Sequence, residues 1–269
     1  MNFSAWLLAN EPIVRLSCFF GVFTLMACWE FNHPFRPLLQ EKWLRWRSNL
    51  SLVVLNSLLL RVMFPVAAVG VAGYAQAKGF GLFVWLDLPI WLEVLLAVVL
   101  LDFLIYAQHV LFHKVPLLWR FHRMHHADPD IDVTTGARFH PVEIVLSMLI
   151  KMLMVFLLGP AVVAVILFEV LLNASAMFNH SNIQLPKLLD RVIRWLFVTP
   201  DMHRVHHSKI PSETDSNYGF ALSCWDRICK TYIEKPTKGQ VGVEIGLNEF
   251  NDPNTSCRLG GMLMLPFKK

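Results

Sequence analysis

Charged residues are scarce in this chain. Lys, Arg, Asp and Glu make up 16% of the 269 residues and the net charge is +4, whereas 55% of the residues are hydrophobic and the mean hydropathy is +0.47. No basic run interleaved with aromatic residues occurs, so nucleic acid binding is not expected. Long apolar runs exclude an ordinary soluble domain. The sequence therefore predicts an all-α integral membrane protein.

Several redox and hydrolytic motifs are also absent. The five cysteines are odd in number and form no C-x-x-C pair, which argues against a disulfide framework and an iron–sulfur cluster. The chain has no H-E-x-x-H motif, no haem-attachment motif and no complete G-x-G-x-x-G loop. Redox chemistry would therefore need electrons from a separate protein. The N-terminus lacks the features of a cleaved signal peptide, so the first apolar segment is expected to remain as an anchor.

Four apolar stretches predict the membrane-embedded part. Three of them read as single spans, at about residues 13–29, 50–74 and 90–112. The fourth covers about residues 142–178, and as one straight helix it would be about 55 Å long against a hydrocarbon core of about 30 Å. Gly159-Pro160 near its middle indicates a turn. We therefore expect a hairpin there, and about four to five embedded helical segments in all.

Basic residues predict the orientation. Arg36, Lys42, Arg45 and Arg47 fall in the loop at 31–49, which places this loop and the chain after His113 in the cytosol, with the N-terminus outside. Three regions follow from the pattern: membrane anchor helices at 1–89, a region at 90–235 that carries most of the histidines, and an irregular cytosolic tail at 236–269. The short form of the chain favours a bacterial inner membrane.

Eight of the eleven histidines fall in three short boxes, HVLFH, HRMHH and HRVHH. Positions i, i+3 and i+4 share one helix face, so each box is expected to present its imidazoles to a common point. A lone histidine is usually a surface or core residue, but two copies of H-x-x-H-H rarely arise by chance. Imidazole binds iron, zinc or copper at neutral pH, and eight imidazoles exceed the needs of one ion. The boxes therefore predict two metal ions, held by His109, His113, His122, His125, His126, His203, His206 and His207.

These boxes resemble those of the fatty acid hydroxylase superfamily, also called the sterol desaturase family. The stretches ARFHPVE (137–143), FNHSNIQLP (178–186), TPDMHRVHHS (199–208) and TDSNYGFALSCWD (214–226) are similar to the family as well. The resemblance covers about residues 90–235, which it implies form the catalytic domain. It implies a cytosolic helical cap that carries the boxes, two iron ions, O2 as co-substrate, and His180 as a ninth metal ligand. Zinc is the alternative metal in isolated protein.

The chain departs from the family pattern at Ala176, where many members have a further metal-site histidine four residues before His180. A tenth ligand is therefore left open, with Asn179 or His140 as substitutes, although His140 reads better as a structural residue. His33 is not expected to take part. Hydrogen bonds that fix the imidazole tautomers are expected from polar residues nearby, with helix caps and turns as their alternative role. These residues are His140, Asn179, Asp201, Asn217, Tyr218 and Asp226.

The resemblance implies a membrane-bound di-iron oxygenase that hydroxylates or desaturates a lipid C–H bond, or cleaves an ether lipid. Its site would lie where the membrane meets the cytosol, with the lipid entering from the side. A ferredoxin, a cytochrome or a reductase would supply the electrons. Two alternatives remain open: a non-catalytic zinc-binding membrane protein, and a bis-histidine haem electron carrier. Bound metal, O2 consumption and a Soret band would separate them.

Overall fold

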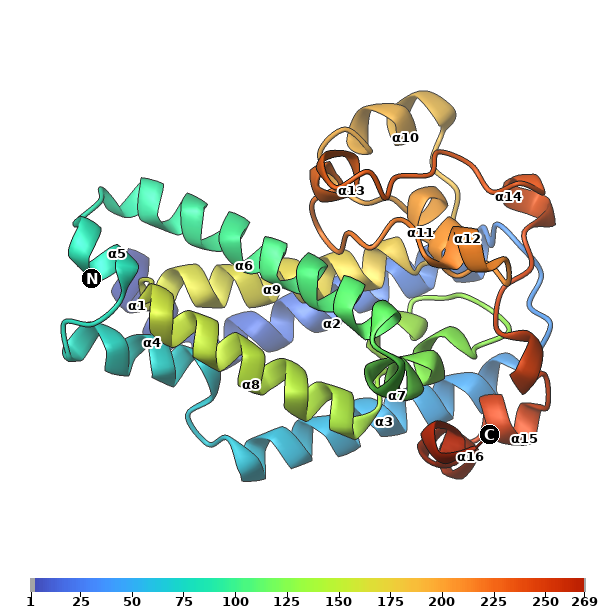
Figure 1. Cartoon of the computed structure of the whole chain (residues 1–269), viewed down its shortest axis with the longest axis horizontal. Coiled ribbons are helices and arrows are strands. Elements are labelled where there is room, and N and C mark those ends of the chain that lie inside the picture. Colours follow the sequence, from blue (N-terminus) through green and yellow to red (C-terminus); the bar gives the residue numbers. More distant parts are fainter. Residues whose placement is uncertain (1–2, 269) are drawn as a thin grey trace.

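Long helices run along the molecule in Figure 1 and form its apolar part. They are α2 (Glu11–Asn32), α3 (Lys42–Met63) continued by α4 (Ala67–Ala77) and α5 (Leu82–Leu86), α6 (Ile90–Lys114), α8 (Pro141–Leu158) and α9 (Val162–Asn179). The computed structural model describes residues 3–268, and within this range it has no β-strand. Among the described residues, five candidate spans are long and apolar enough to cross a membrane. The predicted all-α membrane fold with four to five embedded segments is confirmed.

The second span differs from the prediction of one segment at 50–74. α3 begins earlier, at Lys42, and ends at Met63, and the chain resumes as α4 only at Ala67. Pro65 lies in the break, because proline has no N–H to donate and its ring clashes with the preceding turn. The break lets α4 turn and pack against α8 and α9.

The predicted hairpin at Gly159-Pro160 is confirmed. Gly159 ends α8 in the left-handed conformation with φ +57°, which glycine adopts without steric cost. The backbone of Phe80 and Gly81 packs directly on Gly159, so a side chain there would clash. Each arm has 18 residues and is about 27 Å long. Both flanks of the hairpin therefore return to the same end of the molecule.

α9 is the central helix of the bundle. Half of the residues in its most apolar window are buried, compared with 6% in α2, and it packs against α2, α6 and α4. A core cluster that includes Leu101, Val155 and Phe168 fills the space between α4, α6, α8 and α9. Apolar side chains such as Phe20 and Leu153 point outward, as expected of helices that face lipid.

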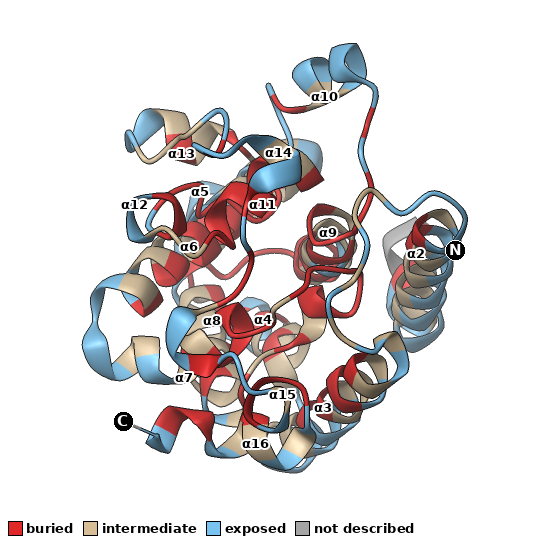
Figure 2. Cartoon of the chain, turned by 90° about the vertical axis from the view of Figure 1, so that its right-hand side faces the viewer, coloured by how far each residue is buried: buried red, intermediate tan, exposed pale blue. Residues whose placement is uncertain are grey.

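A cap of short helices covers one end of the bundle (Figure 1). It contains α7 (Pro116–His126), η1 (Thr135–Ala137), α10 (Lys187–Ile193), α11 (Pro200–His206), α12 (Pro211–Thr214) and α13 (Cys224–Ile228). Seen from the cap end, buried backbone gathers where α6, α7, α9 and α11 meet (Figure 2). The short α1 (Phe3–Ala9) lies at the opposite end.

The prediction of an irregular tail at 236–269 was wrong. This segment forms α14 (Gly239–Gly242), η2 (Asn248–Phe250), α15 (Pro253–Ser256), α16 (Leu259–Met264) and η3 (Leu265–Phe267). Met262 and Leu265 are buried against Leu52 of α3 and Met124 of α7. η2, α16 and η3 each bury an apolar side chain (Phe250, Met262 and Leu265), so the segment belongs to the cap. The outermost residues of the predicted anchor and tail, 1–2 and 269, lie outside the described residues.

Candidate metal centre

Nine histidines meet where the cap joins α6 and α9, and they divide into two clusters. In each cluster one possible ligand atom per residue lies within 4.8 Å of all the others. The five-histidine cluster consists of His109, His113, His122, His126 and His206. The four-histidine cluster consists of His125, His180, His203 and His207. The structure thus brings together all nine histidines singled out from the sequence, whereas His33 is exposed and apart from them.

Each H-x-x-H-H box is split between the two clusters, contrary to the expectation of one common point per box. On α7, His122 and His126 belong to the five-histidine cluster and His125 to the other. The third box shows the opposite division. His206 belongs to the five-histidine cluster, and His203 and His207 belong to the four-histidine cluster. Adjacent residues on a helix point about 100° apart, so one box can serve two neighbouring points.

Local helix signals place the boxes. Pro116 occupies the first turn of α7 and Pro200 that of α11, where a missing N–H costs nothing. The Thr199 side chain caps α11 by accepting a hydrogen bond from the Met202 N–H. His109 and His113 lie in the last turns of α6, and His180 directly follows α9.

Hydrogen bonds at Nδ1 fix the tautomer of five imidazoles. The Nδ1–H groups of His109, His206 and His180 donate to the carbonyls of Tyr218, Ser216 and Ala176, each at 2.7 Å. His125 donates to the Arg138 carbonyl at 3.2 Å, and His122 donates to the Glu143 carboxylate at 2.7 Å. A carbonyl can only accept, so each Nε2 of these rings carries a lone pair and faces the centre.

These inward lone pairs face one another at short range. The Nε2 atoms are 3.1 Å apart for His109 and His122, 3.0 Å for His109 and His206, and 3.1 Å for His125 and His180. A proton between them is disfavoured, since burial lowers the pKa of His206 to about 3 and that of His180 to about 4. Lone pairs so close repel each other unless a cation lies between them.

The spacing and the unpartnered nitrogens fit metal ions. Two nitrogen ligands about 2.1 Å from one ion are about 3.0 Å apart at right angles, and about 3.4 Å apart at the tetrahedral angle. In addition, both ring nitrogens of His126 and His207 are buried without a hydrogen-bond partner among the described residues. Buried polar groups are almost always satisfied, so these atoms point to missing ligands of the imidazoles. The donor set therefore suits two cations, one in each cluster.

Two carboxylates at the five-histidine cluster were not predicted from the sequence. Glu143, in the first turn of α8, is buried and bonds to His122. Asp215 places a carboxylate oxygen 3.4 Å from His113 Nδ1 and pairs with Lys114. An acidic residue at the start of an otherwise apolar helix was the available signal for Glu143, because such residues are costly near a membrane without a partner.

The residues expected to bond to the imidazoles through their side chains bond elsewhere in the described structure. His140 caps α8 and contacts the Leu263 carbonyl, Asn179 donates to the Phe220 carbonyl, and Asp201 binds Arg204. His140 and Asp201 are in neither cluster, so His140 does not supply a tenth ligand. The Asn179 side-chain oxygen is buried without a hydrogen-bond partner among the described residues, so Asn179 as a tenth ligand stays a prediction. The capping bond of His140 and the ion pair of Asp201 with Arg204 engage these two side chains away from the rings.

Asn217 and Asp226 do not contact the imidazoles; they bond to the backbone of the loop that does. Asn217 has φ +50°, and its amide donates to the carbonyls of Met202 and Ile233. Asp226 accepts from the N–H groups of Tyr218 and Gly219. These bonds hold the loop whose carbonyls bind His206 and His109. Tyr218 takes part through its carbonyl rather than its hydroxyl, which donates to Asp215.

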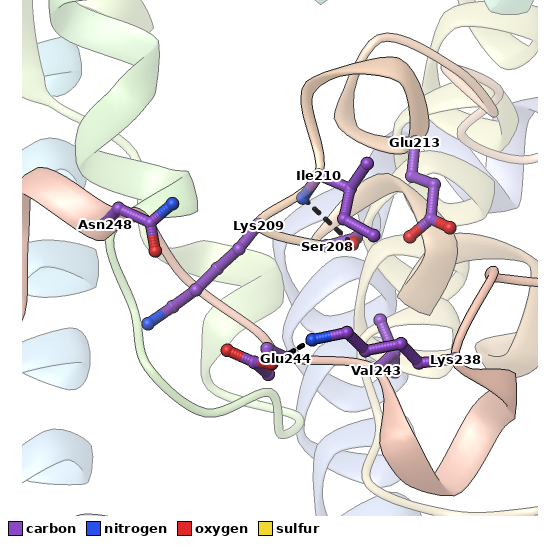
Figure 3. A pocket seen from close by; sticks show the side chains of 8 residues that line it. All are labelled: Ser208, Lys209, Ile210, Glu213, Lys238, Val243, Glu244 and Asn248. Atoms are coloured by element: carbon purple, nitrogen blue, oxygen red, sulfur yellow. Dashed lines mark hydrogen bonds and ion pairs between the residues drawn. The ribbon is translucent and has the colours of Figure 1, made fainter.

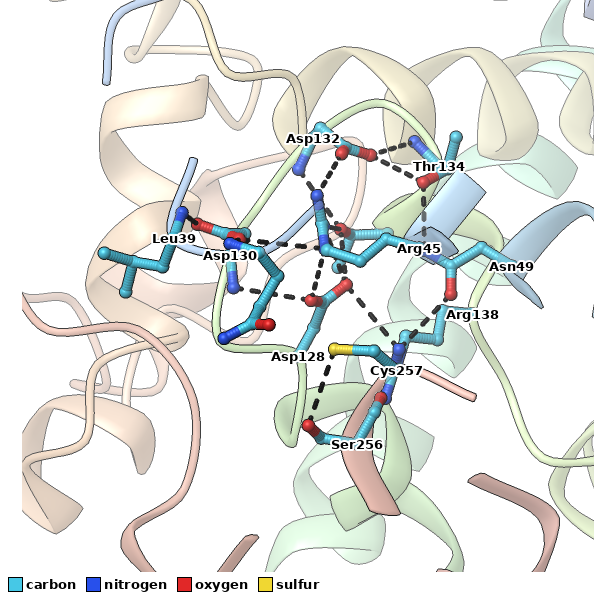
Figure 4. A network of polar contacts seen from close by, with 12 residues as sticks. Leu39, Arg45, Asn49, Asp128, Asp130, Asp132, Thr134, Arg138, Ser256 and Cys257 are labelled. Atoms are coloured by element: carbon cyan, nitrogen blue, oxygen red, sulfur yellow. Dashed lines mark hydrogen bonds and ion pairs between the residues drawn. The ribbon is translucent and has the colours of Figure 1, made fainter. Parts of the chain in front are cut away.

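A buried ionic network fixes the loop at 127–140 that follows the second box (Figure 4). Arg45 of α3 is fully buried, and its guanidinium donates to Asp128 at 2.8 and 2.9 Å and also to Asp132. Burial raises the pKa of Asp128, but the charges of Arg45 and Arg138 outweigh this and hold that pKa below its usual value. The ion pair of Asp128 with Arg45 therefore stays charged.

Arg138 links this network to the imidazoles. Its guanidinium donates to the carbonyls of Met124 and Ser256, and its own carbonyl accepts from His125. The loop, the second box and the C-terminal segment are thus held by one side chain.

Apolar side chains separate the clusters from the helix bundle. The Phe139 ring stacks on His125 with centroids 4.6 Å apart, and the Phe220 ring lies 5.4 Å from that of His109. Both phenylalanines also pack against the core cluster of α4, α6, α8 and α9. The centre therefore meets apolar surface on its membrane side and polar cap on the other.

A small cavity of about 140 Å³ lies in the cap behind the third box (Figure 3). Ser208, Lys209, Glu213, Lys238 and Glu244 are among its lining residues, and Lys238 pairs with Glu244. No histidine lines it, so the cavity is separate from the metal centre.

Comparisons with known proteins agree with the pattern of the boxes. The sequence model of the fatty acid hydroxylase family matches residues 94–231, just over half of the chain. The chain is 28% identical to an ornithine lipid hydroxylase (OlsE) of Rhizobium tropici over 68% of its own length and 54% of that protein. It is 29% and 27% identical to the alkylglycerol monooxygenases of Xenopus tropicalis and Homo sapiens, each over 55% of this chain and 32% of the relative. No solved structure matches the chain significantly.

Proposed function

Because the chain belongs to the fatty acid hydroxylase family, we propose that it is a membrane-embedded, iron-dependent oxygenase that oxidises a C–H bond of a lipid with O2. The observation that carries this proposal is the pair of buried histidine clusters directly beside the apolar helix bundle. The chain spans less than two thirds of the relatives named above, so their activities support a lipid oxygenase without defining the substrate.

The donor set supports iron in both clusters. The five nitrogen donors of the five-histidine cluster exceed the three or four protein ligands of a typical zinc site, whereas the four-histidine cluster equals the larger number. The Nε2 distances of 3.0–3.1 Å suit ligands at right angles better than tetrahedral ones. A non-catalytic zinc protein is therefore disfavoured. Iron, when bound, supplies the activation of O2 that C–H oxidation requires.

The chain's own residues hold the ligands and keep water out. Glu143 and the carbonyls of Tyr218, Ser216 and Ala176 keep the proton on Nδ1 of their partners, so that Nε2 remains a ligand. Phe139 and Phe220 form the boundary toward the bundle, where a lipid chain would approach. The four-histidine cluster has one donor fewer, which leaves more room for a small molecule there.

The substrate that fits this setting is a membrane lipid with a saturated chain. Relatives named as an ornithine lipid hydroxylase and as alkylglycerol monooxygenases make lipid hydroxylation the leading reaction, with ether cleavage and desaturation as the alternatives. We place the centre on the cytosolic face of a bacterial inner membrane, supported by the basic loop at 31–49 on the cap side of the bundle. The electrons come from a separate ferredoxin, cytochrome or reductase.

Lipid mass spectrometry after expression under ¹⁸O₂ tests the function, with metal analysis of the purified protein. The intact chain should yield a lipid that carries the label, or a lipid that has lost two hydrogens, together with bound iron. The variant His206→Ala should lose both the product and metal, because His206 lies between two other ligands. His33→Ala is the matched control, since His33 is exposed. Bound zinc with no oxidised lipid would contradict the proposal.

A further inference from the structure

We propose that an acidic, one-electron donor protein docks on the cap around Trp119, and that the Trp119 ring carries its electrons to the five-histidine cluster. This rests on the oxygenase function, since only a redox centre needs such a partner. Each transfer removes one electron from the donor and adds one to a ferric ion, and no bond is made or broken.

Trp119 covers the five-histidine cluster on the side of the cap. Its ring centroid lies 4.9 Å from that of His113 and 5.4 Å from that of His126. Trp119 is partly exposed, whereas the His113 side chain is 1% exposed. A single indole therefore separates two of the imidazoles from the surface.

The other aromatic rings beside the nine histidines do not lead to the cap surface. Phe112 and Tyr218 are buried, and Phe139 and Phe220 face the apolar core cluster. Within residues 3–268, the partly exposed rings beside the clusters are Trp119 and Phe139, and Phe139 packs against the core cluster, which leaves Trp119 as the ring that reaches the surface of α7. A conjugated ring transmits an electron more readily than a saturated side chain of the same length.

The surface beside Trp119 carries positive charge. Arg120 is exposed, and so is Lys114, which pairs with Asp215 at 2.7 Å. Arg123 lies one turn further along α7, where its guanidinium donates to the Lys268 carbonyl. These three cations face two carboxylates, Asp215 and Glu249, the latter near Arg123. The excess of positive charge favours a partner with an acidic face, because complementary charge speeds encounter and orients the partner.

Anaerobic stopped-flow reduction of the iron-loaded full chain tests the proposal. The protein is held in nanodiscs of zwitterionic lipid and mixed with a reduced [2Fe–2S] ferredoxin of negative net charge. Trp119→Leu should slow reduction of the iron several-fold, and Trp119→Phe should slow it less. Trp195→Leu is the matched control, since Trp195 is 72% exposed and lies against Arg227 rather than an imidazole. Iron content is measured first, so that loss of metal is recognised.

Charge reversal tests the docking surface separately. Arg120→Glu should slow reduction by about tenfold or more at low salt, and the difference should vanish at high salt. Lys187→Glu, on exposed α10, should have no such effect. Unchanged reduction in iron-replete Trp119→Leu would overturn the electron route. If Arg120→Glu weakens binding to anionic vesicles and leaves ferredoxin-driven reduction unchanged, the surface contacts lipid and the docking proposal is wrong.

The readout is reduction of the iron rather than a lipid product. Failure of lipid oxidation and failure of this proposal therefore give different results.

Discussion

At the scale of single residues, five of the nine rings have one nitrogen held by a hydrogen bond and the other nitrogen left for a metal. Backbone carbonyls fix four imidazoles, and a carboxylate fixes the fifth, His122. A carboxylate partner makes the imidazole a stronger electron donor than a carbonyl does. Glu143 therefore has more influence on metal binding than any of the carbonyl partners.

Glu143→Gln should weaken metal binding by about 10–100-fold, because the neutral amide no longer polarises the His122 ring. Competition with a chelator during metal titration of the purified protein measures this. Glu234→Gln is a suitable control, since Glu234 is exposed and only loosely paired with Lys235 at 3.8 Å. Equal metal retention in the two variants would show that His122 does not need its carboxylate.

The pH dependence of the metal-free cap follows from the same rings. A free imidazole has a pKa of about 6.5, whereas burial lowers the pKa of His180 to about 4 and that of His206 to about 3. Between these values the unfolded chain binds protons that the folded chain does not, so stability falls as the pH falls. The Tm of chelator-treated protein should be lower at about pH 5 than at about pH 7.5. An unchanged Tm would mean that the rings are not neutral in the fold.

The sequence allowed the nine histidines to be named, since their spacing is local and their boxes resemble a known family. It did not reveal their partners. Glu143 is 21 residues from His122, and the carbonyls of Ala176, Ser216 and Tyr218 have no side-chain signature. The sharing of each box between two clusters depends on how α7 and α11 face each other, which only the fold determines.

At the scale of elements, two features bring the histidine-bearing segments to one end of the molecule. One is the α8–α9 hairpin, and the other is the ionic network that joins α3 to the loop at 127–140. The hairpin was predictable, because its length, its Gly-Pro signal and the location of the boxes all required it. The ionic network was not predictable from the sequence, because Arg45 and Asp128 are 83 residues apart. A charged residue in a basic segment also gives no sign that it will be fully buried.

Gly159→Ala should destabilise the protein by at least about 1–2 kcal/mol, the cost of a left-handed non-glycine residue. The added methyl group would also clash with the backbone of Phe80 and Gly81. Thermal unfolding in detergent measures the effect. Gly21→Ala in α2 is the control, as its Cβ meets open space, and it should be neutral or stabilising by about 0.5–1 kcal/mol. If the two variants had the same Tm, the turn at Gly159 would have to relax around the added methyl group without cost.

Arg45→Met should destabilise the protein by about 3–5 kcal/mol, because it leaves the carboxylates of Asp128 and Asp132 buried without their cation. The loop should loosen, and with it the Arg138 carbonyl that holds His125, so metal content should fall as well. Arg47→Met, two residues along the same helix and exposed, should change stability by about 0.5 kcal/mol or less. Thermal unfolding and metal analysis of both variants test this prediction. The same Tm and metal content in the two variants would mean that the network rearranges without cost when Arg45 is lost.

At the scale of the whole molecule, the metal centre is the junction between the bundle and the cap. α6 and the end of α9 contribute His109, His113 and His180, and the remaining six ligands come from α7 and the segment around α11. Each cluster contains ligands from both parts. The C-terminal helices close the cap from outside by packing on α3 and α7, which is why the segment predicted as a tail is part of the fold.

Removal of the metals should therefore loosen the cap and leave the bundle intact. Without cations, the facing lone pairs of His109 and His206, and of His125 and His180, repel at 3.0–3.1 Å and push α6, α7 and α11 apart. Binding at a hundredfold excess over Kd contributes about 2.7 kcal/mol, which is lost on chelation. Hydrogen exchange in nanodiscs should become faster in α7 and α11 and stay unchanged in α2 and α4. Equal protection with and without metal would mean that packing alone holds the cap, and the ions would then serve chemistry without supporting the fold.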